Sequence, residues 1–287
     1  MPTRPRVLIV DKRAVMGTEV CRAVAAQGCI ADVFAERGSP AFLSRFCSGR
    51  FVSPPLEKSD EFRAALSALV AANSYSAIHI CHEEILAWIL PLLGRGEWKG
   101  FLHPPIERIE TALSKNAMLS VATQAGVALP RTTIPRDENE LADIARDFGL
   151  PIVIKGDTGE SGETVRIVWD ATELAAKYRE VCARESRPGS PPAVQEFVRG
   201  PAYSVGGLYQ SGRALRVIVH RKLVRYPYPW GGRTVRGITE DSPETCREAF
   251  KIFEALEYTG LGHVEFIRDQ RDGQLKFLEV NPRVWGT

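Results

Sequence analysis

Two carboxylates, an amide and a guanidinium recur in two short segments near the end of the chain. They are Glu265, Glu279, Asn281 and Arg283. If both segments are strands, alternation places the last three on one face, with Leu278 and Val280 on the other. Pairing of the two strands would bring the four polar groups to one patch, and hard oxygen ligands beside an arginine suit Mg²⁺ with bound phosphates. The pattern predicts a site that handles a nucleoside triphosphate.

The turn between the two strands decides whether the two carboxylates meet. Asp272 and Gly273 are a common signal for a two-residue hairpin loop. Such a loop would set Glu265 opposite Val280 and leave the carboxylates on different faces. A connection of three or five residues, or a β-bulge, would set Glu265 opposite Glu279. The metal-site interpretation therefore predicts one of these connections, and the alternative is a solvated hairpin with scattered charges.

A glycine-rich segment follows a lysine in the middle of the chain. A strand-like run, 152–154, ends at Lys155, and the next glycines are Gly156, Gly159 and Gly162. Glycines let backbone N–H groups approach an anion closely, and the lysine adds a positive charge. The segment differs from a Walker loop, because the lysine precedes the glycines and a strand follows them. We expect a phosphate-binding loop here, and an ordinary mobile turn is the alternative.

The composition is that of a soluble globular protein. The 287 residues, 44% hydrophobic and 25% charged, suit two or three domains. A formal net charge of +2 creates no basic field, so no nucleic-acid partner is expected. The six cysteines have no C-x-x-C spacing, which indicates reduced thiols and neither a disulfide frame nor a zinc site. Because no apolar run reaches about 18 residues and the N-terminal segment is too short for a signal peptide, we expect a cytoplasmic protein without a membrane partner.

Strand-like and helical runs alternate in the first third of the chain. The strands are expected at 6–10, 30–34 and 77–81, and the helices at 17–27, 59–73 and 83–94. Such alternation predicts a parallel sheet with helical crossovers, in a domain over 1–105. The loop after the first strand has one glycine where a dinucleotide site needs three, which disfavours a Rossmann oxidoreductase.

Two further modules are expected after this domain. The first covers 106–192, begins with a helix over 106–125 and contains the glycine loop. The second covers 193–287 and ends in the acidic hairpin. The chain therefore reads as an α/β domain followed by two mixed modules.

Arginines and aromatic residues interleave in the segment 221–241, which we expect to be an irregular loop. Arg225 and Arg233 in this segment are candidates to bind a substrate carboxylate through paired hydrogen bonds. A solvated basic loop that packs its aromatic residues on the core is the alternative.

In this order, the motifs resemble the ATP-grasp superfamily, in particular its carbamoyl-phosphate-synthase-like and carboxylate–amine ligase branch, along essentially the whole chain. The motifs are Ser114-Lys115-Asn116, Ile154-Lys155-Gly156 with its glycines, Gln195-Glu196-Phe197-Val198, Glu265 and Glu279-Val280-Asn281-Pro282-Arg283. The resemblance implies an α/β fold in which an N-terminal parallel-sheet, Rossmann-like pre-ATP-grasp domain precedes a two-module ATP-grasp α+β fold. The family usually continues with another helix after the last motif, so the resemblance leaves open that the ATP-grasp fold is truncated at its C-terminus.

The resemblance also implies a role for each motif. Lys115 and Lys155 would contact the ATP phosphates, with Gly159 and Gly162 in the loop that closes over them. The strand Gln195, Glu196, Phe197 and Val198 would hold the adenine edge through the backbone of Glu196 and Val198. Glu265, Glu279 and Asn281 would bind one or two Mg²⁺ ions, with Mn²⁺ as the other possible metal. Arg283, together with Lys155, would act in catalysis and steady the transferred phosphoryl group or the acyl phosphate.

The function that the resemblance implies is that of an ATP- and Mg²⁺-dependent, ADP-forming ligase. It would activate a small-molecule carboxylate as an acyl phosphate, which an amine or ammonia attacks to form a C–N bond. The identity of both substrates and the oligomeric state, including a homo-oligomer, are left open. The alternative is a non-catalytic ATP-binding sensor or scaffold of the same fold. It is suggested by Ala202, which stands where the family carries a glutamate that reaches the ribose hydroxyls.

Overall fold

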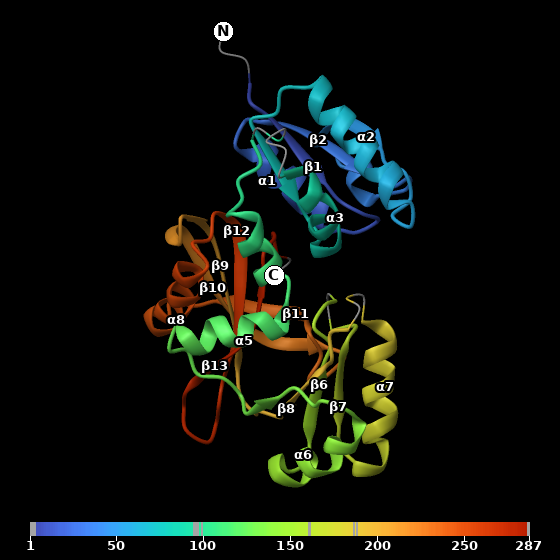
Figure 1. The fold of residues 1–287 in the computed structure, drawn as a ribbon. Coiled ribbons are helices and arrows are strands. Elements are labelled where there is room, and N and C mark those ends of the chain that lie inside the picture. Colours follow the sequence, from blue (N-terminus) through green and yellow to red (C-terminus); the bar gives the residue numbers. More distant parts are fainter. Residues whose placement is uncertain are drawn as a thin grey trace. The chain divides into compact units, whose positions relative to one another are not determined.

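The structure, a computed structural model, describes residues 4–93, 98, 100–159, 162–185, 187 and 189–285 (Figure 1). They form two compact units. The first comprises the described residues up to Glu107 together with 283–285, and the second comprises those from Arg108 to Pro282. The predicted boundary at 192/193, within the second unit, stays a prediction. None of the described helices is long and apolar enough to span a membrane.

The first unit is built on a parallel four-stranded sheet with the order β3-β2-β1-β4. Its strands are β1 (Arg6–Val10), β2 (Ile30–Ala35), β3 (Cys47–Val52) and β4 (Ala77–Ile80), and its helices are α1 (Met16–Ala26), α2 (Ser59–Ala72) and α3 (Glu83–Leu93). A short 3-10 turn, η1 (Pro40–Leu43), precedes β3. The parallel α/β fold confirms the prediction, although β3 was missing from it.

Helices cover both faces of this sheet. Cys21 of α1 packs on one face with Ile9 and Val33. On the other face, Phe62 of α2 makes an edge contact with Phe34, with ring centroids 5.1 Å apart. Burial on both faces explains why β1 is a continuous apolar run and not an alternating one.

The second unit begins with two helices in place of the single predicted one. They are α4 (Ile106–Ala112) and α5 (Lys115–Gln124). The prediction of one helix over 106–125 is wrong at Ser114, which has an extended backbone and accepts a hydrogen bond from the N–H of Ala117. Ser114 is therefore the N-cap of a new helix, and this interruption places Lys115 at the start of α5.

A four-stranded sheet with the order β5-β8-β6-β7 follows. Its strands are β5 (Thr132–Thr133), β6 (Ile152–Lys155), β7 (Val165–Val168) and β8 (Ala193–Glu196), with α6 (Leu141–Phe148), α7 (Leu174–Arg184) and the 3-10 turns η2 (Glu138–Glu140) and η3 (Ala171–Glu173). One apolar core, which includes Leu141, Ile152 and Tyr178, joins both helices to the sheet. The glycine loop connects β6 to β7.

The second sheet of this unit has five antiparallel strands in the order β11-β10-β9-β12-β13. The strands are β9 (Ala202–Gln210), β10 (Arg213–Tyr226), β11 (Arg233–Thr239), β12 (Gly260–Arg268) and β13 (Leu275–Asn281), and α8 (Pro243–Ala255) precedes β12. The expectation of an irregular loop over 221–241 is wrong, because β10 extends to Tyr226 and β11 pairs with it.

One face of the five-stranded sheet carries the core of the second unit. Met118 of α5 and Phe253 of α8 are buried there with Val264 and Phe266 of β12, and Figure 1 shows both helices beside this sheet. Because strand side chains alternate, His263, Glu265 and Ile267 point to the opposite face. Burial of Val264 and Phe266 in the core therefore places His263, Glu265 and Ile267 on the face of the sheet away from the core.

Candidate active site

The two strands of the C-terminal hairpin pair so that the predicted carboxylates meet. Glu265 of β12 lies directly opposite Glu279 of β13. The register changes between Glu265 and Phe266, where β13 contributes one extra residue, Leu278. This is a β-bulge, one of the irregular connections that the metal-site interpretation required. The predicted register is confirmed.

The bulge also decides which side chains reach the cavity beside the hairpin. Leu278 and Glu279 are neighbours in sequence, and both line that cavity. The expectation that Leu278 faces away from Glu279 is wrong, because the extra residue of a bulge interrupts the alternation of faces. The bulge thereby places an apolar wall next to a carboxylate.

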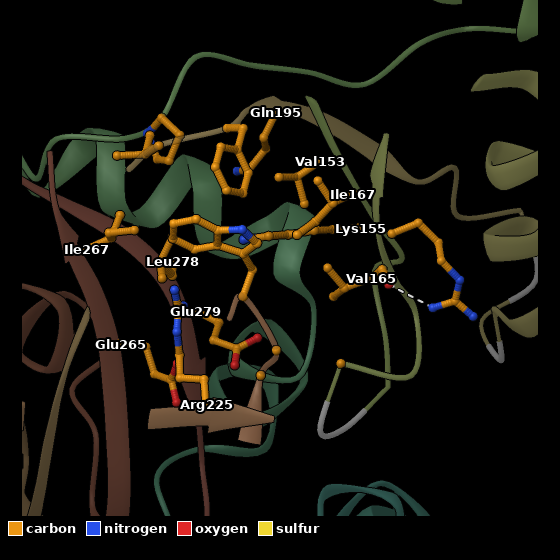
Figure 2. A pocket seen from close by; sticks show the side chains of 18 of the residues that line it. Val153, Lys155, Val165, Ile167, Gln195, Arg225, Glu265, Ile267, Leu278 and Glu279 are labelled. Carbon is orange, nitrogen blue, oxygen red and sulfur yellow. Dashed lines mark hydrogen bonds between the residues drawn. The ribbon is translucent and has the colours of Figure 1, made fainter. Parts of the chain in front are cut away.

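The cavity lies between the two sheets of the second unit and has a volume of about 570 Å³. Figure 2 shows Glu265, Glu279 and Arg225 grouped at one end. The other end is lined by Val153, Ile167 and Gln195 from one sheet, with Ile267 and Leu278 across from them on the other (Figure 2). A volume of this size and a lining that is apolar at one end and polar at the other are typical of small-molecule sites.

The polar end of the cavity carries a surplus of positive charge. Four cationic side chains that have no ion-pair partner outside the lining, among the residues the structure describes, contribute to the cavity, namely Lys115, Lys155, Lys222 and Arg225. Lys222 and Arg225 interact electrostatically with Glu265, and Lys155 interacts with Glu279. Arg166 and Glu196 also line the cavity, but both form ion pairs with residues outside its lining. Four positive charges against those of Glu265 and Glu279 favour a ligand with several negative charges, such as a polyphosphate.

Glu265 is held by two neighbours on its own sheet. Its Oε1 lies 2.6 Å from Lys222 Nζ and 3.6 Å from His263 Nε2. Although burial alone would raise the pKa of Glu265, Lys222 and His263 bring it below its ordinary value. Glu265 is therefore ionised, and a metal cation would compete with Lys222 for this carboxylate.

Two lysines line the cavity beside the glycine loop. Lys155 ends β6, and Lys115 begins α5 and donates a hydrogen bond of 2.9 Å to the carbonyl of Gly159. Burial lowers the pKa of Lys155, while the charge of Glu279 raises it and that of Lys115 lowers it further. An anion bound beside the two lysines would offset both the burial and their repulsion.

Asp157, at the start of the glycine loop, is hydrogen-bonded to the first residues of α5 and to its N-cap. Its carboxylate accepts hydrogen bonds from Ser114 Oγ at 2.7 Å, the N–H of Asn116 at 2.9 Å, Ser190 Oγ at 2.8 Å and Arg187 Nη1 at 2.9 Å. Burial alone would raise the pKa of Asp157, but these donors lower it. Asp157 was not among the predicted site residues, because aspartate beside glycine also marks an ordinary turn.

The strand predicted to hold an adenine edge does run along the cavity. All four of its predicted residues contribute to the lining, namely Gln195, Glu196, Phe197 and Val198. The carboxylate of Glu196 turns to the C-terminal hairpin, where it lies 3.1 Å from Lys276 Nζ and 2.8 Å from Arg271 Nη2. These ion pairs occupy the side chain of Glu196, and its backbone N–H donates a hydrogen bond of 2.9 Å to the carbonyl of Arg131. The predicted contact between the backbone of this strand and an adenine edge stays a prediction.

Three predicted site residues are not placed in the cavity. Asn281 lies opposite His263, is 6% exposed, and is absent from the described lining. Arg283 belongs to the first unit, where its Nε lies 3.2 Å from Glu83 Oε1. Arg233 begins β11, but its side chain lies outside the described residues. The roles assigned to these three residues stay predictions, as do those of the cavity-lining residues.

In the first unit, a carboxylate lies at the N-terminus of α1, the position where a Rossmann enzyme would bind the phosphates of a dinucleotide. Asp11, which follows β1 and is fully buried, accepts a hydrogen bond of 2.9 Å from the N–H of Gly17 in the first turn of α1. Its other oxygen lies 2.7 Å from His82 Nε2. A helix N-terminus attracts anions, and here the protein's own carboxylate takes that position.

The donor set in the cavity fits magnesium. Mg²⁺ usually takes one or two carboxylates and completes its shell with water and substrate phosphates, and Glu265 and Glu279 are two such carboxylates. In the part of the chain that the structure describes, no cluster of three His, Cys, Asp or Glu side chains suits a metal. The cavity thus offers two carboxylates to a magnesium ion, whose other ligands would be water and phosphate oxygens.

A family model for the ATP-grasp domain matches residues 114–287, more than half of the chain. Biotin carboxylase from Nostoc sp. is 26% identical over 206 residues, which cover 64% of this chain and 43% of that protein. The chain spans between 7% and 43% of the length of the curated relatives it matches.

Two solved structures share the fold at low sequence identity. The biotin carboxylase domain of 2-oxoglutarate carboxylase from Hydrogenobacter thermophilus, in complex with MgADP, ADP and bicarbonate, matches with a TM-score of 0.76 and 20% identity over 99% of this chain and 65% of that one. L-amino acid ligase from Bacillus licheniformis matches with a TM-score of 0.72 and 19% identity over 100% of this chain and 68% of that one. These matches confirm the fold predicted from the motifs. The chain belongs to the ATP-grasp family.

Proposed function

We propose that the cavity binds ATP with magnesium and that the chain is an ADP-forming carboxylate–amine ligase. The observation that carries the proposal is the meeting of Glu265 and Glu279 at the bulge, in one cavity between two sheets that Lys115 and Lys155 also line. The family match supports it, as do the neighbours named as an amino acid ligase and as a carboxylase domain with bound MgADP.

The proposed position of the nucleotide follows from the two ends of the cavity. The apolar end, flanked by Val153 and Ile167 on one side and by Leu278 on the other, suits a planar base (Figure 2). The polar end, with its four cations, suits the triphosphate. Glu265 and Glu279 would hold the magnesium, which when bound neutralises charge on the phosphate oxygens.

The proposed reaction has two steps. A carboxylate oxygen of the first substrate attacks the γ-phosphorus, the bond to the β-phosphate oxygen breaks, and ADP leaves. The lone pair of the amine then attacks the carbonyl carbon of the acyl phosphate, phosphate leaves, and the amine loses a proton. Lys115, Lys155 and Arg225 contribute by stabilising charge on the transferred group and by holding it in place. No covalent nucleophile from the chain is required.

Substitution of Glu279 by glutamine tests the proposal. The variant keeps the shape of the side chain but removes a metal-binding charge, so ADP formation should fall by about a hundredfold or more. ADP release is measured over a panel of small carboxylates and amines, with Glu254→Gln as control because Glu254 is exposed on α8. An undiminished ADP yield in Glu279→Gln would refute the assigned role.

A non-catalytic ATP-binding module is the second candidate. Ala202 favours it, since this residue of β9 is 3% exposed and offers no polar group for a ribose. Nucleotide binding without ADP release across the whole panel would support the sensor, whereas ADP release that depends on both a carboxylate and an amine would support the ligase.

A further inference from the structure

The loop between β10 and β11 is a tight turn that only glycine permits at one position. The N–H of Gly231 donates to the carbonyl of Pro227 at 2.6 Å. A Cβ atom on Gly231 would lie 2.0 Å from the carbonyl carbon of Tyr226. Because the backbone is packed this closely at Gly231, the turn has one conformation, and this conformation fixes the position of the neighbouring residue, Trp230.

Trp230 is half-buried in a turn whose tyrosines are exposed. Tyr226 is 61% exposed and Tyr228 is 81% exposed. Trp230 lines the cavity together with its neighbours Pro227, Tyr228, Pro229, Gly231 and Gly232. A large aromatic ring that lines a cavity and is only half-buried presents a surface to a ligand, which a fully buried core residue does not.

Three contacts hold the indole between the two ends of the cavity. Its ring meets Phe197 edge-to-face, with centroids 5.2 Å apart and planes at 89°. The guanidinium carbons of Arg199 and Arg225 each lie 5.7 Å from its ring centroid. Phe197 belongs to the strand predicted to hold the base, Arg199 follows that strand, and Arg225 belongs to the polar end. The ring is therefore oriented by contacts toward both ends.

The cavity has room for a nucleotide with this ring in place. Its volume of about 570 Å³ is measured with Trp230 in the lining, and this value lies within the usual range for ligand pockets. The indole is thus a wall of the site. Aromatic rings placed this way stack with nucleobases, because every base has a π-face.

We propose that Trp230 stacks on the base of the bound nucleotide and sets the preference of the site for a nucleotide over a free polyphosphate. The proposal rests on the proposed function, since it assumes that ATP is the ligand. It assigns to the β10–β11 turn a part in recognition of the base, separate from the phosphate contacts of Lys115 and Lys155.

The test compares ATP with sodium tripolyphosphate, which shares the charged part of ATP but has no base. Affinities of the full chain for both ligands are measured by calorimetry in the presence of magnesium. Trp230→Ala should weaken ATP binding at least about fivefold and leave tripolyphosphate binding unchanged. Trp230→Phe keeps an aromatic face and should lose less ATP affinity than Trp230→Ala. Tyr226→Ala is the control, because it removes an aromatic residue from the start of the same turn.

Gly231→Ala provides an independent variant, because it keeps the indole but cannot keep the turn. It should lose the same discrimination between the two ligands. Wild-type discrimination in either Trp230→Ala or Gly231→Ala would overturn the proposal, as would an equal loss for both ligands or tighter ATP binding without the ring. If the wild-type chain bound neither ligand, the proposed function itself would fail, and this outcome is distinct from all the others.

Discussion

Replacement of Lys276 by methionine should destabilise the second unit. Lys276 lies in β13 and is 8% exposed, and its Nζ lies 2.7 Å from Asp269 Oδ2 and 3.1 Å from Glu196 Oε1. Methionine keeps the apolar stem but removes the ammonium group, so two buried carboxylates lose a cation. The contact joins the end of β8 to the C-terminal hairpin, which links the two sheets that enclose the cavity.

The magnitude follows from what remains after the substitution. Removal of one partner from a buried ion pair costs about 3–5 kcal/mol of unfolding free energy. Arg271 Nη2 stays 2.6 Å from Asp269 Oδ2 and 2.8 Å from Glu196 Oε2, but its side chain is 60% exposed. Because Arg271 still compensates part of the charge, we expect the lower end of the range, about 3 kcal/mol.

Urea unfolding at pH 7, followed by tryptophan fluorescence, measures this loss. The matched control is Lys251→Met, since Lys251 pairs with Glu248 at 2.7 Å but is 43% exposed. The control should change the unfolding free energy by less than about 1 kcal/mol. A loss below about 1 kcal/mol for Lys276→Met, or equal losses for both variants, would refute the reasoning.

The unfolding free energies of wild type and Lys276→Met should become more similar at low pH. Although burial would raise the pKa of Glu196, hydrogen bonds from Arg131, Arg271 and Lys276 lower it in the folded state. A carboxyl group with a lowered pKa stabilises the fold above its unfolded pKa, and this contribution disappears as the pH falls through the folded value. The difference between wild type and Lys276→Met should therefore shrink below about pH 4.

Two further predictions concern the backbone and a histidine. Gly200→Ala should lower the unfolding free energy by about 2–3 kcal/mol, because Gly200 has a φ of +156° and a Cβ atom there would lie 1.7 Å from the carbonyl oxygen of Arg268; a thermal midpoint equal to wild type would contradict this. Burial lowers the pKa of His79 in β4 from 6.5, so the unfolded chain binds the proton more readily and stability should fall as the pH drops below about 6.5. His79→Gln should weaken this pH dependence, and identical shifts of the urea midpoint between pH 7 and pH 5 in both chains would contradict it.

The C-terminal hairpin shows what a local sequence pattern can predict about strands and their faces. The alternation of Glu265, Glu279 and Asn281 with apolar residues predicted two strands and their polar face, because side-chain direction in a strand depends only on position along the chain. It also identified the condition for a metal site, an irregular register. Which irregularity occurs depends on how Leu278 packs, and only the folded chain shows that it bulges.

The β10–β11 ribbon shows where a local pattern is insufficient. Pro227, Pro229 and several arginines interrupt the hydrophobic alternation, so the segment reads as a loop although it forms two paired strands. Lys222 and Trp230 belong to this segment, but the sequence pattern assigned neither of them a role in the site. Their partners, Glu265 and Phe197, lie far away in sequence, and no periodicity within a short window reports such contacts.

The sequence by itself determined the parallel sheet of the first unit, the glycine loop after Lys155 and the family, because hydrophobic period, glycine placement and motif order are local properties of the chain. Tertiary structure decided the bulge that brings Glu265 and Glu279 together, the ion pair of Glu265 with Lys222 and the place of Trp230 in the cavity lining. These features join residues that are distant along the chain, and their geometry depends on how whole strands and turns pack against one another.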